Sequence, residues 1–200
     1  TIAKSFIEIP IAFSRSSFLD TLILTEDQKG EYNNFWSFWN GIYPIVKDVV
    51  VKDYGTNYRD RNQMIRSFLL AFPYWGKEAK NWKSLKDREK NFYSKIISEL
   101  GSHPDVLYSV AKFLTEIGTP FQNEGVFWLR DIINKSPKIN SKELEQNILY
   151  YLELFMQCFF IEKRDTIKKN TAYKDAVLTI LNFLIEHNSV AGYLMRESIL

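Results

Sequence analysis

Apolar residues recur at the spacing of an amphipathic helix along most of this chain. Residues 103–118 give the clearest case, because Pro104 and Asp105 favour a helix start and Gly118 favours a stop. The apolar stripe of this segment consists of Val106, Val110, Phe113, Leu114 and Ile117. The pattern therefore predicts a helix that buries one side.

Further helices are predicted at residues 119–137, 141–169 and 171–188, and a last one begins after Ser189. Thr119 and Pro120 supply a cap and a first-turn proline for the helix at 119–137. That helix follows its predecessor so closely that the two are expected to lie antiparallel as a hairpin. Thr171 is expected to cap the helix at 171–188, and Asn188 is expected to end it.

Upstream, the pattern predicts helices at 31–50, 58–72 and 84–100, with a loop or broken turn at 73–83. Residues 1–28 are expected to be irregular, because Pro10 interrupts their weak strand-like alternation. We therefore predict an all-α chain, with an irregular segment at 1–28 and a helical domain at 29–200.

One sequence pattern occurs twice. Residues 110–120, VAKFLTEIGTP, align with residues 180–190, ILNFLIEHNSV, and beyond them Arg130–Asp131 corresponds to Arg196–Glu197. A repeated helix–stop–cap–helix unit indicates antiparallel helix pairs stacked as a solenoid-like helical-repeat array. An irregular helical bundle is the alternative, because Leu and Phe at helical spacing are common.

The segment 31–50, EYNNFWSFWNGIYPIVKDVV, is rich in aromatic residues. At about 100° per residue, one line of the helix contains Tyr32, Trp36, Trp39 and Tyr43. A second apolar line, which includes Ile45, lies beside it, and Pro44 belongs to the polar side. An apolar arc this wide is typical of a helix covered on two sides. The four aromatic residues are therefore candidates for core, for a protein interface or for a site that stacks a flat ligand.

The composition is that of a globular protein, with 46% hydrophobic, 25% charged and 16% aromatic residues. The formal net charge of +2 neither requires nor excludes a nucleic-acid partner. A single cysteine excludes an internal disulfide framework, and Cys158 lies in an apolar helical run where a buried thiol is expected. No apolar run is long enough for a membrane span and the start does not resemble a signal peptide, so we expect a cytoplasmic protein without a membrane partner.

No catalytic or metal-binding constellation stands out in the sequence. His103 and His187 each fall at a predicted helix boundary, without Cys, His or Asp at ligand spacing. No phosphate-binding glycine loop, nucleophile elbow or zinc-protease motif occurs. We therefore predict no catalytic residue, no metal and no cofactor.

The basic stretch 77–95 is a candidate for nucleic-acid contact, because basic residues bind phosphates while interleaved Trp82, Phe92 and Tyr93 would stack on bases. The candidate contact residues are Lys77, Lys80, Trp82, Lys83, Lys86, Arg88 and Lys90. Intervening acids fit an ordinary solvated helix face instead. A smaller basic cluster at 162–170 is explained by its place near a helix C-terminus, where cations complement the helix dipole.

These patterns favour a non-catalytic helical binding or scaffold module, whose partner is another protein or another domain of the same protein. The chain begins with Thr1 and ends in an apolar, helix-like pattern, so we expect it to be part of a larger intracellular protein. A nucleic-acid-contacting domain that uses residues 77–95 is the alternative. A second alternative is part of an enzyme whose site lies mostly outside this chain.

Overall fold

A computed structural model describes residues 40–41, 43–48, 65–66, 68–69, 82–101, 103–117, 121–135 and 146–199. These residues form helices, turns and short connections, and no strand occurs among them. The all-α prediction is therefore confirmed for the described part of the chain. The chain divides into two compact units, Thr1–Ser84 and Leu85–Leu200. The boundary predicted after residue 28 lies outside the described residues.

Helical backbone in the first unit is described at 40–41, 43–48, 65–66 and 68–69. Tyr43 and Val46 are buried, as are Ile65, Phe68 and Leu69 from the later segment. The ring of Tyr43 stacks on that of Phe68, with centroids 5.8 Å apart and planes 24° from parallel. Two segments that the sequence predicts as helices therefore share buried aromatic contacts within this unit.

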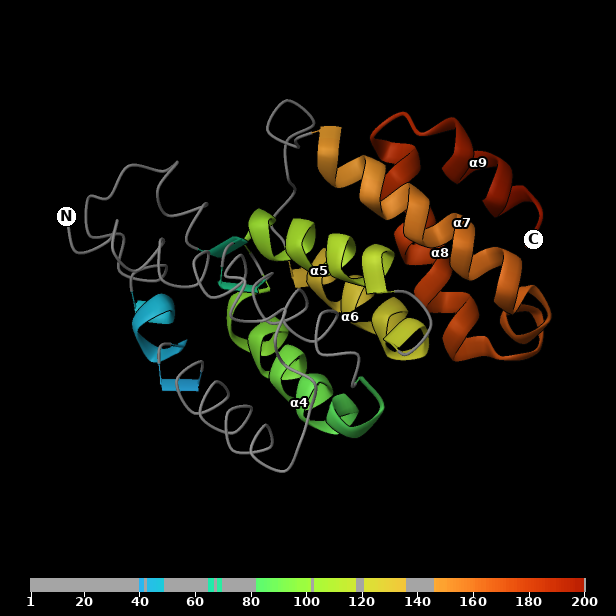
Figure 1. Ribbon diagram of the computed structural model, residues 1–200. Helices are drawn as coiled ribbons and strands as arrows, with labels where there is room; N and C mark the ends of the chain where they lie inside the picture. The colour runs from blue at the N-terminus through green and yellow to red at the C-terminus, as the bar shows by residue number, and fades with distance from the viewer. Residues whose placement is uncertain are drawn as a thin grey trace. The chain divides into compact units, whose positions relative to one another are not determined.

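The second unit contains helix α4 (Trp82–Leu100) from Leu85 onward. It also contains α5 (Pro104–Ile117), α6 (Gln122–Lys135), α7 (Gln146–Lys169), α8 (Thr171–Glu186) and α9 (Val190–Glu197) (Figure 1). The helices predicted from residue 84 onward are all present. Trp82 and Lys83, predicted to lie in a loop, are helical instead. No Gly or Pro interrupts the chain between Trp82 and Leu100, so the helix extends back through both residues.

The core of the second unit is built around Tyr93 of α4, whose side chain is fully buried. Its ring stacks on Phe113 of α5 at 4.7 Å between centroids and on Trp128 of α6 at 5.7 Å. The indole of Trp128 donates a hydrogen bond back to Ser94 Oγ at 3.3 Å. This aromatic cluster thus joins α4, α5 and α6, and the hydrogen bond to Ser94 satisfies the indole N–H of Trp128.

Among the described helices, α5 packs on α6, α7 on α8 and α8 on α9, in addition to the contact of α4 with α5 through Tyr93 and Phe113. Helices two places apart also pack, α5 with α7, α6 with α8 and α7 with α9 (Figure 1). The sequence echo relates α5–α6 to α8–α9, which is a shift of three helices. The described contacts therefore do not establish a structural repeat that matches the sequence echo.

The ends of α8 show how local chemistry sets a helix boundary. Asn170 has an extended backbone, and its Oδ1 accepts hydrogen bonds from the N–H groups of Ala172 at 3.0 Å and Tyr173 at 3.3 Å. Asn170 is therefore the cap, and the predicted cap Thr171 is the first helical residue. At the other end His187 is the C-cap residue, and Asn188 adopts the left-handed φ of 65° that stops the chain.

Candidate interaction surface

The aromatic line predicted at 31–50 is described only at Tyr43. Tyr43 is 2% exposed and packs on Phe68, so this residue belongs to the core of its unit. Tyr32, Trp36 and Trp39 lie outside the described residues. Ile45, predicted to lie on the second apolar line, is exposed in the structure, as is its neighbour Pro44.

Two of the three aromatic residues proposed to stack on bases in the basic stretch 77–95 are not accessible. Phe92 and Tyr93 are buried in the core, so neither ring is available to a base, because both face the inner side of α4. Lys90 forms an ion pair with Glu124 of α6. Lys77 and Lys80 lie outside the described residues, and only the helical backbone is described for Trp82, Lys83, Lys86 and Arg88.

Both histidines serve helix ends. His103 precedes α5, and its Nδ1 lies 3.3 Å from the backbone nitrogen of Asp105. His187 Nδ1 lies 2.8 Å from the carbonyl oxygen of Phe183. Within the described residues no group of three His, Cys, Asp or Glu side chains is placed to hold a metal ion. None of the described helices combines the length and the hydrophobicity needed to cross a bilayer.

Tyr173, in the first turn of α8, carries a titratable hydroxyl on a half-buried ring. Its ring lies between Phe127 of α6, 5.0 Å away, and Phe159 of α7, 6.1 Å away. Burial, and to a smaller extent the charge of Glu124, raise the pKa of the Tyr173 hydroxyl above its usual value. A raised pKa keeps the phenol protonated at neutral pH, which suits a packing role and gives no activated nucleophile.

Helix α7 is apolar on more than its buried side. Its inner face is formed by Ile148, Leu152, Phe155, Met156, Phe159 and Ile167. Cys158, expected to be buried, is exposed, because the inner stripe passes through the adjacent Phe159 and places residue 158 on the outer side. Ile161 is 80% exposed on the same outer side. A single exposed aliphatic residue does not by itself mark an interaction surface.

Helix α9 packs closely on α8 through Gly192. A β-carbon at this position would lie 2.9 Å from Leu184 Cβ and 3.4 Å from the carbonyl oxygen of Leu181. Ser189 fixes the start of the helix, because its Oγ accepts a hydrogen bond from the N–H of Gly192 at 2.9 Å, which confirms the predicted cap. These contacts set which side of α9 faces α8.

The opposite side of α9 is apolar and open to solvent. Val190 is 73% exposed, Tyr193 is 51% exposed and Leu194 is 64% exposed. Spacings of three and four residues place these side chains on one stripe, the pattern by which helices pack on other helices. Among the described helices, α9 thus presents an apolar face that no described residue covers; we call it the α9 face.

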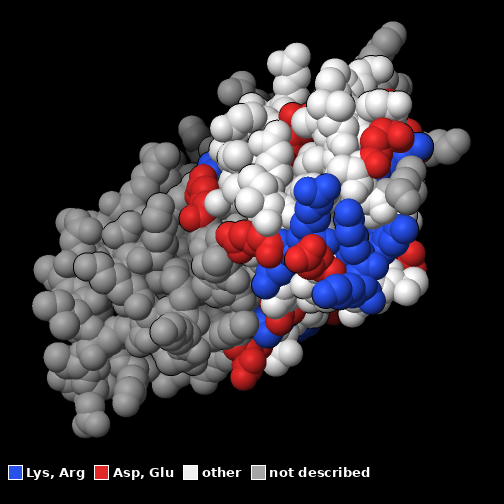
Figure 2. Space-filling view, turned by 90° about the vertical axis from the view of Figure 1, so that its right-hand side faces the viewer, with Lys and Arg blue, Asp and Glu red and all other residues white. Residues whose placement is uncertain are grey.

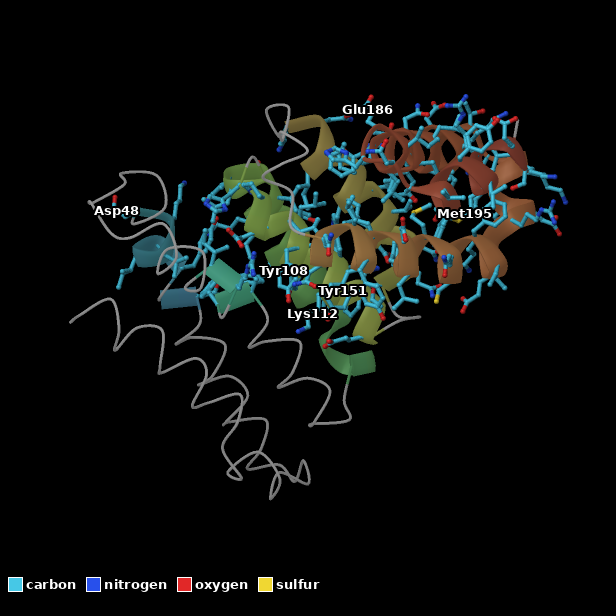
Figure 3. All side chains as sticks on the ribbon, turned by 90° about the horizontal axis from the view of Figure 1, so that it is seen from above. Asp48, Tyr108, Lys112, Tyr151, Glu186 and Met195 are labelled. Atoms are coloured by element: carbon cyan, nitrogen blue, oxygen red, sulfur yellow. The ribbon has the colours of Figure 1, made fainter. Side chains whose placement is uncertain are left out.

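A second group of exposed and half-buried side chains joins α5 to α7. The ammonium of Lys112 lies 5.7 Å from the ring centroid of Tyr151 and 6.0 Å from that of Tyr108. Figure 3 labels these three residues on α5 and α7. The two tyrosine rings meet edge to face at 5.7 Å. Glu116 forms an ion pair with Lys112 at 3.7 Å, so the charge of Lys112 is balanced within α5. This cluster stabilises the contact between the two helices.

Basic side chains gather where α7 ends and α8 begins (Figure 2). This group, which we call the junction surface, consists of Lys163, Arg164, Lys168, Lys169 and Lys174. None of the five forms an ion pair with another described residue. Sequence reasoning explained residues 162–170 by the helix dipole alone. That explanation overlooked that only Asn170 separates α7 from α8. This short connection places Lys174 of α8 near the cations at the end of α7.

No protein-family model matches this chain, and no curated protein matches its sequence. Its function is therefore argued from its own residues.

Proposed function

We propose that the chain is a non-catalytic helical binding module that contacts another protein, or another domain of a larger protein, inside the cytosol. The α9 face is the observation that carries the proposal. Three large apolar side chains, each at least 51% exposed, occupy one stripe of a helix that is held rigidly by its contact with α8. Apolar side chains presented on a fixed element are the usual anchors of protein interfaces.

The occupant we propose for the α9 face is a helix with an apolar stripe of its own. Packing between helices two places apart supports this choice, because α5, α7 and α9 form a row in which each contacts the next. A further helix from the partner would continue that row over Val190 and Leu194. The same contacts support stacking of helix pairs in a solenoid-like order, in which each helix of a row covers an apolar side of its neighbour.

Photo-crosslinking tests the proposed binding. We replace Leu194 by p-benzoylphenylalanine, and in a control protein place the same group at Ser98, an exposed residue of α4. We expect the probe at 194 to give a discrete product with one other protein, and expect Tyr193→Ser to reduce its yield at least fivefold because the stripe loses an anchor. Circular dichroism verifies that each variant folds.

Several results would contradict the proposal. Equal crosslinking from position 98 would show that contact is unspecific, and absence of any product at 194 would show that the face has no partner. A product that consists of two copies of this chain would assign the face to self-association.

Residues 77–95 give less support to a nucleic-acid function. Phe92 and Tyr93 are buried and Lys90 is paired with Glu124, so these three residues do not support contact with nucleic acid. We therefore propose no second function for residues 77–95.

A further inference from the structure

We infer that the junction surface binds an acidic segment of a partner protein, one that carries apolar residues among its carboxylates. This inference extends the proposed binding function to a second surface, and it does not depend on the α9 face. It rests on the position of five cations, on their lack of described ion-pair partners and on an exposed isoleucine beside them.

The five cations are close together because of the chain path. Helix α7 ends at Lys169 and α8 begins at Thr171, and backbone bonds from Asn170 N to Thr166 O and from Lys174 N to Asn170 O make the turn tight. At about 1.5 Å of rise per residue, all five cations lie within two turns of this corner. Figure 2 shows the resulting concentration of basic side chains on one face.

Unpaired charges leave this surface ready for an anionic partner. The described ion pairs of the second unit involve Lys90, His103, Lys112, Arg130 and Arg196. None involves a cation of the junction surface. The guanidinium of Arg164 lies over the ring of Phe160, 5.8 Å from its centroid, which holds its charge at the surface. Charge complementarity then guides and orients the acidic segment.

Ile161 adds an apolar anchor to the same face of α7. Ile161, Arg164 and Lys168 are spaced by three and four residues, so they share one side of the helix. The isoleucine side chain is 80% exposed. A partner that places an aliphatic residue against Ile161 and carboxylates against the flanking cations would match this arrangement.

The surface fits a protein segment better than it fits nucleic acid. Glu162, Asp165 and Asp175 interrupt the cations, so the surface lacks the unbroken positive line that a run of phosphates requires. A peptide with apolar residues among its carboxylates can place those carboxylates against the cations alone. Phe160 lies half-buried under Arg164, and Tyr173 is half-buried between two other rings, so neither offers a free face for a base. The same three acids oppose the uniform negative charge of an anionic lipid surface.

Fluorescence anisotropy on the 200-residue chain tests the inference. The probe is a fluorescein-labelled synthetic peptide of Asp and Glu with Leu at every fourth position. We expect salt-dependent binding that Lys168→Glu with Lys169→Glu weakens about tenfold or more. Ile161→Ser should weaken the Leu-containing peptide about fivefold. It should leave the binding of polyglutamate unchanged.

Matched variants make the result specific. Lys95→Glu with Lys135→Glu changes the net charge equally at exposed positions of α4 and α6, and it should alter affinity less than twofold. Lys168→Arg with Lys169→Arg should retain binding. Leu194→Ser should also retain binding of the peptide. The inference about the junction surface and the proposal about the α9 face can therefore fail independently.

Three outcomes would overturn the inference. The first is an equal loss of peptide affinity in the variant with Lys95→Glu and Lys135→Glu, which would show that binding depends only on net charge. The second is binding of oligo(dT) as tight as that of the peptide and equally sensitive to Lys168 and Lys169. The third is binding of phosphatidylserine vesicles with that same sensitivity.

Discussion

Gly192 lies at a close approach of α9 to α8, where a side chain larger than a hydrogen atom would collide with Leu184. The nearest atom to an added β-carbon is Leu184 Cβ at 2.9 Å, and Cβ cannot move without its backbone. The side chain of Leu184 is fully buried, so the surrounding core gives little room for adjustment.

We expect Gly192→Ala to lower the free energy of unfolding by about 1–3 kcal/mol, because α9 must shift away from α8. Urea unfolding followed by circular dichroism measures the change. The matched variant is Gly41→Ala, where an added β-carbon meets nothing within 4 Å. That variant should be neutral or more stable by up to about 1 kcal/mol, since Ala favours a helix. Equal stability of both variants would contradict the close approach.

Tyr173 gives the chain a specific alkaline sensitivity. Burial and Glu124 raise the pKa of its hydroxyl in the folded chain above the ordinary value of 10.0, so the unfolded chain loses this proton first. The stabilisation is complete below the ordinary pKa and is lost as the pH rises through the raised pKa. Tyr173→Phe cannot ionise, and it should therefore lose less stability than the wild type between about pH 9 and pH 11.

Unfolding free energies at several pH values in that range test this difference. Tyr193→Phe removes a hydroxyl from an exposed position on α9 and serves as the comparison. Parallel pH profiles for wild type and Tyr173→Phe would show that Tyr173 does not contribute.

At the scale of an element, α8 depends on a cap that the sequence shows only in part. Asn170 supplies the oxygen for two backbone N–H groups, and Thr171 follows it inside the helix. Both residue types are good caps, so sequence alone places the boundary within one residue. The apolar stripes were more informative, because burial of Val106, Val110 and Phe113 follows directly from their helical spacing.

We expect Asn170→Ala to destabilise the chain by about 1 kcal/mol, because the N–H groups of Ala172 and Tyr173 lose their acceptor. Thermal unfolding measures the effect. Asn170→Asp should stay within a few tenths of a kcal/mol of wild type, since its carboxylate accepts the same bonds. Asn147→Ala, an exposed change in the first turn of α7, is the control. A loss in Asn147→Ala as large as that in Asn170→Ala would contradict the capping role.

The candidate surfaces were harder to predict than the helices, for a physical reason. Spacing identifies an apolar stripe, but it does not reveal whether another helix covers that stripe. Val190 and Leu194 on α9 have the same pattern as buried Val177 and Leu181 on α8. Likewise the junction surface joins residues from two helices, and that proximity depends on the tight corner at Asn170.

At the scale of the whole molecule, the division into two units leads to a direct expectation. The aromatic cluster around Tyr93 and the described contacts among α5, α6, α7, α8 and α9 lie within Leu85–Leu200. A chain of this length is typical of an independently folding domain. Residues 82–200, which include all of α4, should therefore be helical by circular dichroism and unfold in one cooperative thermal transition. A broad, non-cooperative transition would show that this part requires the preceding unit.

The order of helix contacts also governs how fast this part of the chain can fold. Every principal contact joins helices one or two places apart in the chain, so each can form after closure of a short loop. Low contact order of this kind is associated with folding in about microseconds to milliseconds. The α9 face and the junction surface would then be assembled soon after synthesis, before the exposed apolar residues meet many competing chains.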